Sequence, residues 1–357
     1  VLHAAGYRTA AFLSNMCEAN HQGWDSFRCS GGSDGKTVSR ALDWARTDGS
    51  AGTDGAAGAA GATGGNGRPF LLWVHLFGCH GPYYNGGDVA RQLDPGYDGL
   101  LGPKKWRLDQ VMTRHLKLTD GDLRHLYALY DAAVMGSDRL AGALFDGLRQ
   151  ARRLDHTLFV LAADHGEELY AHNGYLYHSC SVYQTALHVP LGFAGPGLLP
   201  AGPRVPQAVE LLDVTPTILD LLGVAPPDRL DGRSLVPYFE RPDSGGTGKP
   251  AFSEYGATAL HTVVDGAWKL VHNPGGVDPD CIPGLPPHHQ FPIAKAELYD
   301  LANDPGETHD LAAREPARVA ELGRLISRRF ANRTHHAPQT ISKELKKKLG
   351  TLGYVDH

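Results

Sequence analysis

The sequence lacks any long apolar run. No stretch approaches the about 20 consecutive apolar residues of a transmembrane helix, so we expect no membrane span. Cysteine is scarce as well. Five cysteines occur in 357 residues without a Cys-x-x-Cys pair, which excludes a disulfide-rich scaffold. Cys17 and Cys29 are close enough in sequence to form one bridge, but the sequence leaves their pairing open.

A strong charge of one sign is also missing. The formal net charge is −5, which argues against nucleic acid as a partner. The apolar content of 42% is enough for a sizeable core, and the length accommodates one large domain and a smaller one. The given sequence contains no signal peptide, and it opens with Val1 within a structural element. We therefore interpret the chain as a fragment that has lost its N-terminal part.

Hydrophobic patterning predicts an α/β protein. Short apolar runs predict four buried strands, over Thr9–Leu13, Phe70–Leu76, Thr157–Leu161 and Val189–Phe193. Leucines and alanines at helical spacing predict a long helix from Asp120 to Leu148, capped by Asp120 or Asp122. Because a helix leads into the Thr157 strand, we expect a mainly parallel central sheet flanked by helices. A second helix is expected over Asp213–Gly223.

The C-terminal part has a different pattern. Short strands predict an antiparallel sheet, over Thr262–Val264, Trp268–Val271 and Glu297–Tyr299. An amphipathic helix over Pro316–Phe330 follows them. We therefore expect a large domain over 1–240, a smaller α+β subdomain over 250–335 and a tail over 336–357. Residues 47–67 are almost all small or polar and predict a flexible insertion.

A carboxylate and an imidazole follow the apolar run Thr157–Leu161, where the predicted strand ends. In open α/β sheets the ligand crevice lies at the carboxyl ends of the strands. Asp164 and His165 are a hard and a borderline ligand, so they could share one divalent cation. The alternative is that Asp164 caps a following helix and that His165 is incidental.

Further histidines lie in two loops. The strand Phe70–Leu76 leads into a loop shaped by glycine and proline, with His80 at its centre. A histidine there suits a general acid or a phosphate- or sulfate-contacting group. The alternative is a histidine that hydrogen-bonds its own loop. His172 and His178 follow His165 closely, so a metal triad is conceivable, but their spacing fits no standard zinc motif such as HExxH.

Several short motifs occur in order along nearly the whole chain. They are Leu2–Ala10, His75–Tyr83, Ala163–Leu169, His188–Leu191, Asp213–Thr217, Asp231–Leu235, Glu297–Leu301, Asp304–Glu307 and Leu349–Val355. Each is weak by itself, but together and in this order they resemble the sulfatase family of the alkaline-phosphatase superfamily. The resemblance implies an alkaline-phosphatase-like fold, with residues 1–240 as the catalytic domain.

The resemblance also implies a reaction. Sulfatases are metal-dependent hydrolases that cleave sulfate esters with a formylglycine nucleophile, formed by oxidation of a cysteine or serine. Asp164 and His165 are implied as metal ligands, with Ca²⁺ as the expected ion and Mn²⁺ as the alternative. The expected substrate is a sulfated small molecule or glycan. Most members of the family are secreted, periplasmic or lysosomal.

Four further positions correspond to family site residues. His80 and His178 are implied as catalytic residues that contact the sulfate or protonate the leaving oxygen. Tyr83 and His172 are implied as substrate-binding residues.

The chain departs from the family at the nucleophile. No Cys/Ser-x-Pro-x-Arg motif occurs, and the early Asp-Asp pair that supplies the other metal ligands is missing. In the family both lie upstream of the stretch with which this chain begins. We therefore interpret the chain as N-terminally truncated and expect it to be inactive by itself. The alternatives are a phosphonate or phosphate ester hydrolase of the same superfamily and a non-catalytic relative that binds sulfated glycans.

Overall fold

The structure is a computed structural model. It describes residues 1–15, 17, 22–46, 68–83, 87–101, 117–172, 174–176, 178, 181–200, 202, 204–241, 248–255, 260–275 and 293–331. The expected insertion at 47–67 and the expected tail at 336–357 lie outside these residues. Among the described helices, none combines the length and the apolar character needed to cross a bilayer.

The chain divides into two compact units that interleave along the sequence. The first contains residues 1–160, 193–199 and 221–229, and the second contains 161–192, 200–220 and 230–357. The domain boundaries expected at 1–240 and 250–335 stay a prediction.

A parallel sheet lies in the first unit. Strand β1 (Arg8–Leu13) pairs on one side with β2 (Ser26–Cys29) and on the other with β3 (Phe70–His75), so the order is β2-β1-β3. The buried strand expected from the apolar run at 9–13 is confirmed. The strand expected at 70–76 is present, but its residues are only partly buried and Trp73 is exposed. Strand β2 was not predicted because its four residues are too short to show a pattern. Its last residue, Cys29, forms a disulfide with Cys17.

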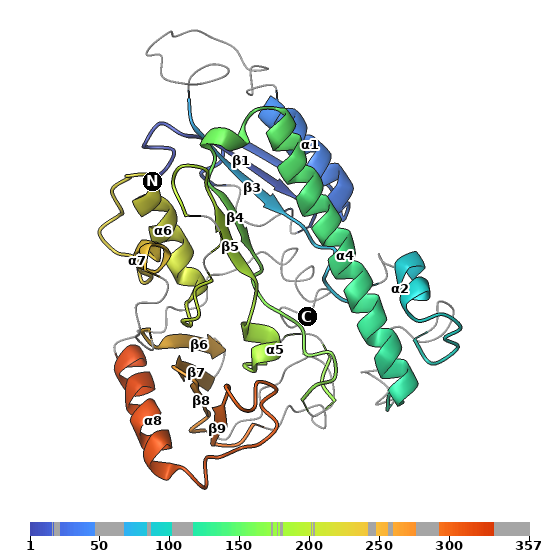
Figure 1. The fold of residues 1–357 in the computed structure, drawn as a ribbon, viewed down its shortest axis with the longest axis vertical. Coiled ribbons are helices and arrows are strands. Elements are labelled where there is room, and N and C mark those ends of the chain that lie inside the picture. The colour runs from blue at the N-terminus through green and yellow to red at the C-terminus, as the bar shows by residue number, and fades with distance from the viewer. Residues whose placement is uncertain are drawn as a thin grey trace. The chain divides into compact units, whose positions relative to one another are not determined.

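Two helices, α1 (Asp34–Arg46) and α4 (Asp120–Gln150), lie side by side against this sheet (Figure 1). Their apolar faces and the inner face of β1 form one core, which includes Ala10, Phe12, Val38, Ala41, Leu42, Leu144 and Leu148. Gly147 allows the close approach of the helices, because a Cβ there would lie 2.5 Å from the Leu42 side chain. Two shorter elements, α2 (Gly87–Leu93) and η2 (Leu154–His156), flank α4 in sequence.

The N-cap of α4 differs from the prediction. The cap is Thr119 rather than Asp120 or Asp122, and its hydroxyl accepts a hydrogen bond from the Asp122 backbone N–H. Asp122 is the third helical residue, and its carboxylate accepts from the Thr119 N–H at 2.9 Å. This reciprocal arrangement is a capping box.

Strands β4 (Phe159–Ala162) and β5 (Leu191–Ala194) are neighbours in a two-stranded sheet. Both predicted strands are present, and each begins two residues later than the apolar run suggested. The expectation that they are buried was wrong, because every residue of β4 and β5 is exposed or only partly buried. The helix expected at 213–223 is a 3₁₀ turn, η3 (Leu211–Asp213), followed by α6 (Val214–Leu221).

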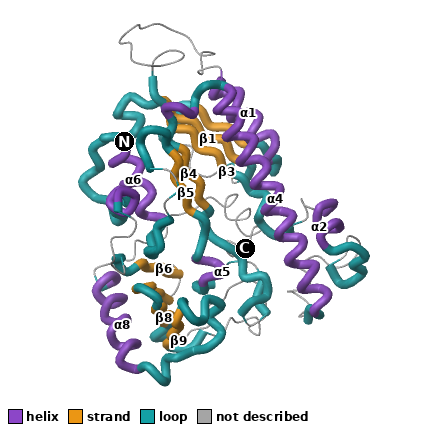
Figure 2. The backbone as a smooth tube through the Cα atoms, viewed as in Figure 1, coloured by secondary structure: helices purple, strands orange, loops and turns teal. Residues whose placement is uncertain are grey.

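The C-terminal part of the second unit is an antiparallel sheet with one long helix. Strands β6 (Ala251–Tyr255), β7 (Leu260–Asp265), β8 (Trp268–His272) and β9 (Ala296–Asp300) pair in that order. Helix α8 (Pro316–Phe330) lies beside them (Figure 2). The shared core is Val263, Leu270, Leu298, Leu322 and Ile326. The predicted antiparallel sheet and helix are confirmed. The short helices α5 (Gln184–Leu187) and α7 (Val236–Glu240) belong to the same unit.

Candidate functional site

The loop after β4 contains Asp164 and His165. No helix follows Asp164 directly in the structure, so it is not a helix cap. Its carboxylate instead accepts a hydrogen bond from the His165 backbone N–H at 3.0 Å. The other carboxylate oxygen lies 3.7 Å from His165 Nε2, and the Asp164 side chain is 75% exposed. This exposed acid and its neighbouring imidazole are therefore open to a ligand from solvent.

Gly166 fixes the path of this loop. Its N–H donates to the Ala186 carbonyl at 2.8 Å. A Cβ at this position would lie 2.1 Å from the backbone oxygen of Thr185, which no side-chain rotation relieves. Only glycine therefore allows the Asp164–His165 turn to pack directly on the α5 segment.

His165 lies in a cluster that the sequence did not predict as a unit. Its ring stacks on that of His178, with centroids 3.7 Å apart. His178 Nδ1 is 3.1 Å from Glu167 Oε1, and the Glu167 side chain is 4% exposed. One donor atom from each of the three residues lies within 4.8 Å of the others. We call His165, Glu167 and His178 the His-Glu-His cluster.

His172 belongs to a different network. Its Nδ1 is 2.8 Å from a carboxylate oxygen of Glu168, and its Nε2 is 3.2 Å from the Gly306 carbonyl. Its ring stacks on Tyr183 at 3.9 Å. Burial by itself lowers the pKa of His172, but the hydrogen bond and the charge of Glu168, with the charge of Glu307, outweigh it. The pKa of His172 therefore lies above its usual value.

The same network continues to the C-terminal sheet. Lys269 Nζ contacts Glu307 Oε1 at 2.5 Å, and both side chains are fully buried. Burial lowers the pKa of Lys269, although the charge of Glu307 opposes it. Glu297 accepts hydrogen bonds from the hydroxyls of Tyr183 and Tyr299 at 2.8 and 2.9 Å. Burial and the charge of Glu297 raise the pKa of both tyrosines.

His80 and Tyr83 lie in the first unit, in the loop after β3. The His80 ring stacks on Phe77 at 4.2 Å, and its Nδ1 donates to the Gly81 carbonyl at 2.7 Å. The hydrogen bond to its own loop, which the sequence left as an alternative, is therefore present. Tyr83 is 1% exposed and its ring meets Tyr130 of α4 edge-on at 5.4 Å. Tyr83 therefore holds this loop against the helix.

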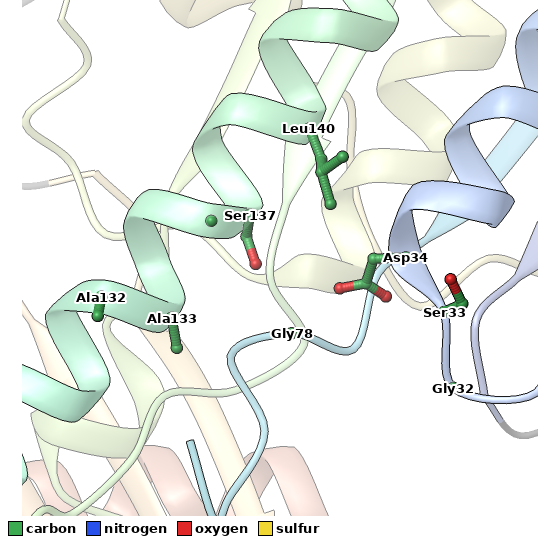
Figure 3. A pocket seen from close by; sticks show the side chains of 9 residues that line it. Gly32, Ser33, Asp34, Gly78, Ala132, Ala133, Ser137 and Leu140 are labelled. Atoms are coloured by element: carbon green, nitrogen blue, oxygen red, sulfur yellow. The ribbon is translucent and has the colours of Figure 1, made fainter. Parts of the chain in front are cut away.

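A cavity of about 300 Å³ lies beside the same loop (Figure 3). The Asp34 side chain at the start of α1 and the Ser137 side chain of α4 point into it. Asp34 Oδ1 accepts from the Phe77 N–H at 2.9 Å, and the Cys79 thiol donates to the Ser137 hydroxyl at 3.2 Å. The cavity is therefore lined by polar groups that have partners within the protein. None of the residues predicted for the site lines it.

The structure brings together part of the predicted site. His165 and His178 are stacked, with Asp164 adjacent to His165. His172 lies in the Glu168 network, and His80 and Tyr83 belong to the other unit. The expectation that His80 faces Asp164 and His165 stays a prediction. Sequence reasoning missed Glu167, although the sequence places it two residues after His165.

Comparison with known proteins gives a family match. The family model described as Sulfatase matches residues 1–224. Arylsulfatase K of Bos taurus is 26% identical over 321 residues, which cover 81% of this chain and 53% of that protein. Choline-sulfatase of Rhizobium meliloti is 31% identical over 206 residues, which cover 56% of this chain and 35% of that protein. The chain therefore spans about half or less of the length of these relatives.

Solved structures share the fold. One protein, solved in complex with its substrate D-glucosamine-2-N,6-O-disulfate, superposes with a TM-score of 0.63. The match covers 93% of this chain and 81% of that chain at 17% sequence identity. The expected fold, with a parallel sheet and a C-terminal antiparallel sheet, is confirmed.

Proposed function

Because this chain belongs to the sulfatase family, we propose that it carries part of the active site of a hydrolase that cleaves sulfate esters. The family match over residues 1–224 carries this proposal, since it includes both histidine-bearing loops, after β3 and after β4. The proposed substrate is a sulfated small molecule or glycan. In support, one relative is named a choline-sulfatase, and one structural neighbour was solved with a disulfated glucosamine.

His80 is the proposed proton donor to the leaving oxygen. A carbonyl only accepts, so the hydrogen bond to Gly81 places a proton on Nδ1 of His80. Its Nε2 is then the nitrogen that would face the substrate. In the imidazolium form, Nε2 would donate its proton to the leaving oxygen. His178 is the proposed sulfate contact, with its ring oriented by the buried carboxylate of Glu167.

Tyr83 and His172 are proposed to support substrate binding. Tyr83 is packed on Tyr130, and both ring nitrogens of His172 are engaged by the protein. These contacts favour a role in shaping the two loops that a substrate would meet.

The family implies a divalent metal ion, for which Asp164 and His165 are the proposed ligands, with Ca²⁺ first and Mn²⁺ as the alternative. Calcium takes six to eight oxygen ligands. This pair offers one carboxylate and one ring nitrogen, 3.7 Å apart. The pair therefore supplies only part of a calcium shell, and we derive no catalytic step through the metal. The formylglycine nucleophile would be supplied by a motif that is not in this sequence.

Steady-state kinetics of the whole protein on paired aryl sulfate and aryl phosphate esters test the proposal. We expect kcat/KM to be higher for the sulfate ester, and His80→Ala to lower it about 10²- to 10⁴-fold by removing the acid. The matched control is His156→Ala, an exposed histidine at the end of η2. Preference for the phosphate ester would replace the proposal with the phosphate or phosphonate alternative. Absence of turnover on both esters, with retained binding of a sulfated glycan, would favour the non-catalytic alternative.

A further inference from the structure

Three arginines from distant parts of the chain gather at one end of the parallel sheet in the first unit. Arg8 begins β1, and its partner in the strand register is Phe70, the first residue of β3. Arg68 lies two residues before Phe70, and its Nε donates to the Gly6 carbonyl at 3.1 Å. Arg153 follows the C-terminal end of α4. We call Arg8, Arg68 and Arg153 the arginine cluster.

The cluster lies where the ends of several elements meet. Figure 1 shows the C-terminal ends of α1 and α4 at the same end of the first unit as the start of β3. Trp44 of α1 packs against the core, and the Arg8 guanidinium lies over its ring at 4.8 Å from the centroid. Leu154, the neighbour of Arg153, is buried in the same core. Arg8 and Arg153 are therefore half-buried, whereas Arg68 is exposed.

The guanidinium groups of the cluster act on one another. Burial lowers the pKa of Arg8, and the charges of Arg68 and Arg153 lower it further. The charge of Asp25 opposes these effects only in part. The dipole of α4 favours a cation at its C-terminal end, which accounts for Arg153. It does not account for Arg8 and Arg68, which lie at the starts of two strands, so their proximity calls for another source of negative charge.

We propose that the arginine cluster is a binding surface for a sulfated glycan, separate from the loop that contains His80. A guanidinium presents a planar fork of N–H donors that matches the oxygens of a sulfate group. Strand β3 runs from Phe70 to His75 at about 3.3 Å per residue, so the two ends of the strand lie about 15–20 Å apart. The cluster is at one end and the His80 loop follows the other.

The choice among anions follows from the chain as a whole. The net charge of −5 disfavours a long nucleic acid, whereas a local cluster of three cations suits a short chain with several sulfate groups. The choice of a sulfated glycan rests on the proposed function, which names a sulfated glycan as a candidate substrate.

Fluorescence anisotropy of a labelled heparin octasaccharide, titrated with the whole protein, tests the surface. We expect Arg68→Gln to weaken binding about fivefold, the upper range for one exposed charge pair. The triple variant Arg8→Gln, Arg68→Gln and Arg153→Gln should weaken binding about 10²-fold, as three such steps. Binding by the wild type should also weaken as salt rises, since exposed charges are screened.

Two controls separate the cluster from charge in general. Arg91→Gln removes the same charge from an exposed arginine of α2, where it pairs with Asp88, and should bind as the wild type does. Arg68→Lys keeps the charge and should weaken binding less than Arg68→Gln. Because Arg8 packs on Trp44, circular dichroism checks the fold of the triple variant. The exposed Arg68 decides the test even if that variant does not fold.

Three results would overturn the proposal. The first is equal binding by the wild type and Arg68→Gln. The second is equal binding of an octasaccharide of hyaluronan, which has carboxylates but no sulfate groups. The third is tighter binding of an oligodeoxynucleotide of the same charge, which would replace the sulfated glycan with a nucleic acid.

The surface and the proposed function fail separately. Turnover of the aryl sulfate ester by the whole protein should be unchanged by Arg68→Gln, because the cluster is outside the proposed active-site residues. Turnover of the aryl sulfate without arginine-dependent glycan binding would refute this surface alone. Arginine-dependent glycan binding without turnover of any sulfate ester would refute the proposed hydrolysis alone.

Discussion

At the scale of single residues, the described chain contains a fully buried lysine. Lys269 contacts Glu307 at 2.5 Å, and Glu307 also accepts a hydrogen bond from the Gln184 N–H at 2.5 Å. Sequence reasoning could not find this pair. A lysine in the strand at 268–271 is expected to face solvent, and its partner lies 38 residues further on. Burial of such a charge depends on a contact that only the fold creates.

Removal of one partner should therefore be costly. We expect Lys269→Met to lower the free energy of unfolding by about 3–5 kcal/mol, because Glu307 is left as a buried, uncompensated charge. The double variant Lys269→Met with Glu307→Gln should recover part of this loss, since it removes both charges. Urea unfolding followed by circular dichroism measures both values, with the exposed Lys36→Met as the control. Equal losses in the single and double variants would contradict the ion-pair account.

At the scale of elements, the spacing of apolar residues predicted the bounds of helices well, whereas the identity of a helix cap could not be predicted from the residue types around it. The helix at 316–330 has the bounds that its apolar spacing indicated. The predicted start of α4 at Asp120 is confirmed, but its cap was wrong, since the sequence favoured Asp120 or Asp122 over Thr119. Asp122 also has a second structural role that the sequence pattern did not predict. It also accepts from the Tyr97 hydroxyl and the Leu100 N–H. The hydrogen bonds from Thr119, Tyr97 and Leu100 together outweigh burial and lower the pKa of Asp122 to about 2.

The capping box predicts an order of stability for three variants of α4. We expect Thr119→Ala to destabilise the fold by about 1 kcal/mol, the usual cost of losing an N-cap hydroxyl. Asp122→Ala should cost more, because it also removes the acceptor for the Tyr97–Leu100 segment. Asp131→Ala, at an exposed position within the helix, should stay within about 0.5 kcal/mol of the wild type. Thermal unfolding ranks the three variants. An Asp122→Ala variant no worse than Thr119→Ala would contradict the second role of Asp122.

At the scale of the whole molecule, the second unit is assembled from distant stretches of chain. Its loop residues His172 and Tyr183 are hydrogen-bonded to the C-terminal part, at Gly306 and Glu297. The length and residue pattern of the chain predicted a large domain and a smaller one, and the ordered motifs predicted the family and the fold. The His-Glu-His cluster was beyond such reasoning, because it depends on how the 165–178 loop turns back on itself. The motifs predict His165 as a metal ligand but give no reason to place Glu167 beside it.

This assembly should make stability depend on pH through His172. Its pKa is raised in the folded state, so its protonation stabilises the fold below the unfolded pKa of about 6.5. That contribution is lost as the pH rises through the higher folded pKa. We therefore expect the wild type to lose more unfolding free energy than His172→Gln between about pH 6 and about pH 9. Urea unfolding at both pH values measures the difference. His188→Gln, which changes an exposed histidine, corrects for the substitution itself. Parallel pH profiles for the wild type and His172→Gln would show that the Glu168 contact does not hold a proton on His172, and that the loop is held by its uncharged contacts alone.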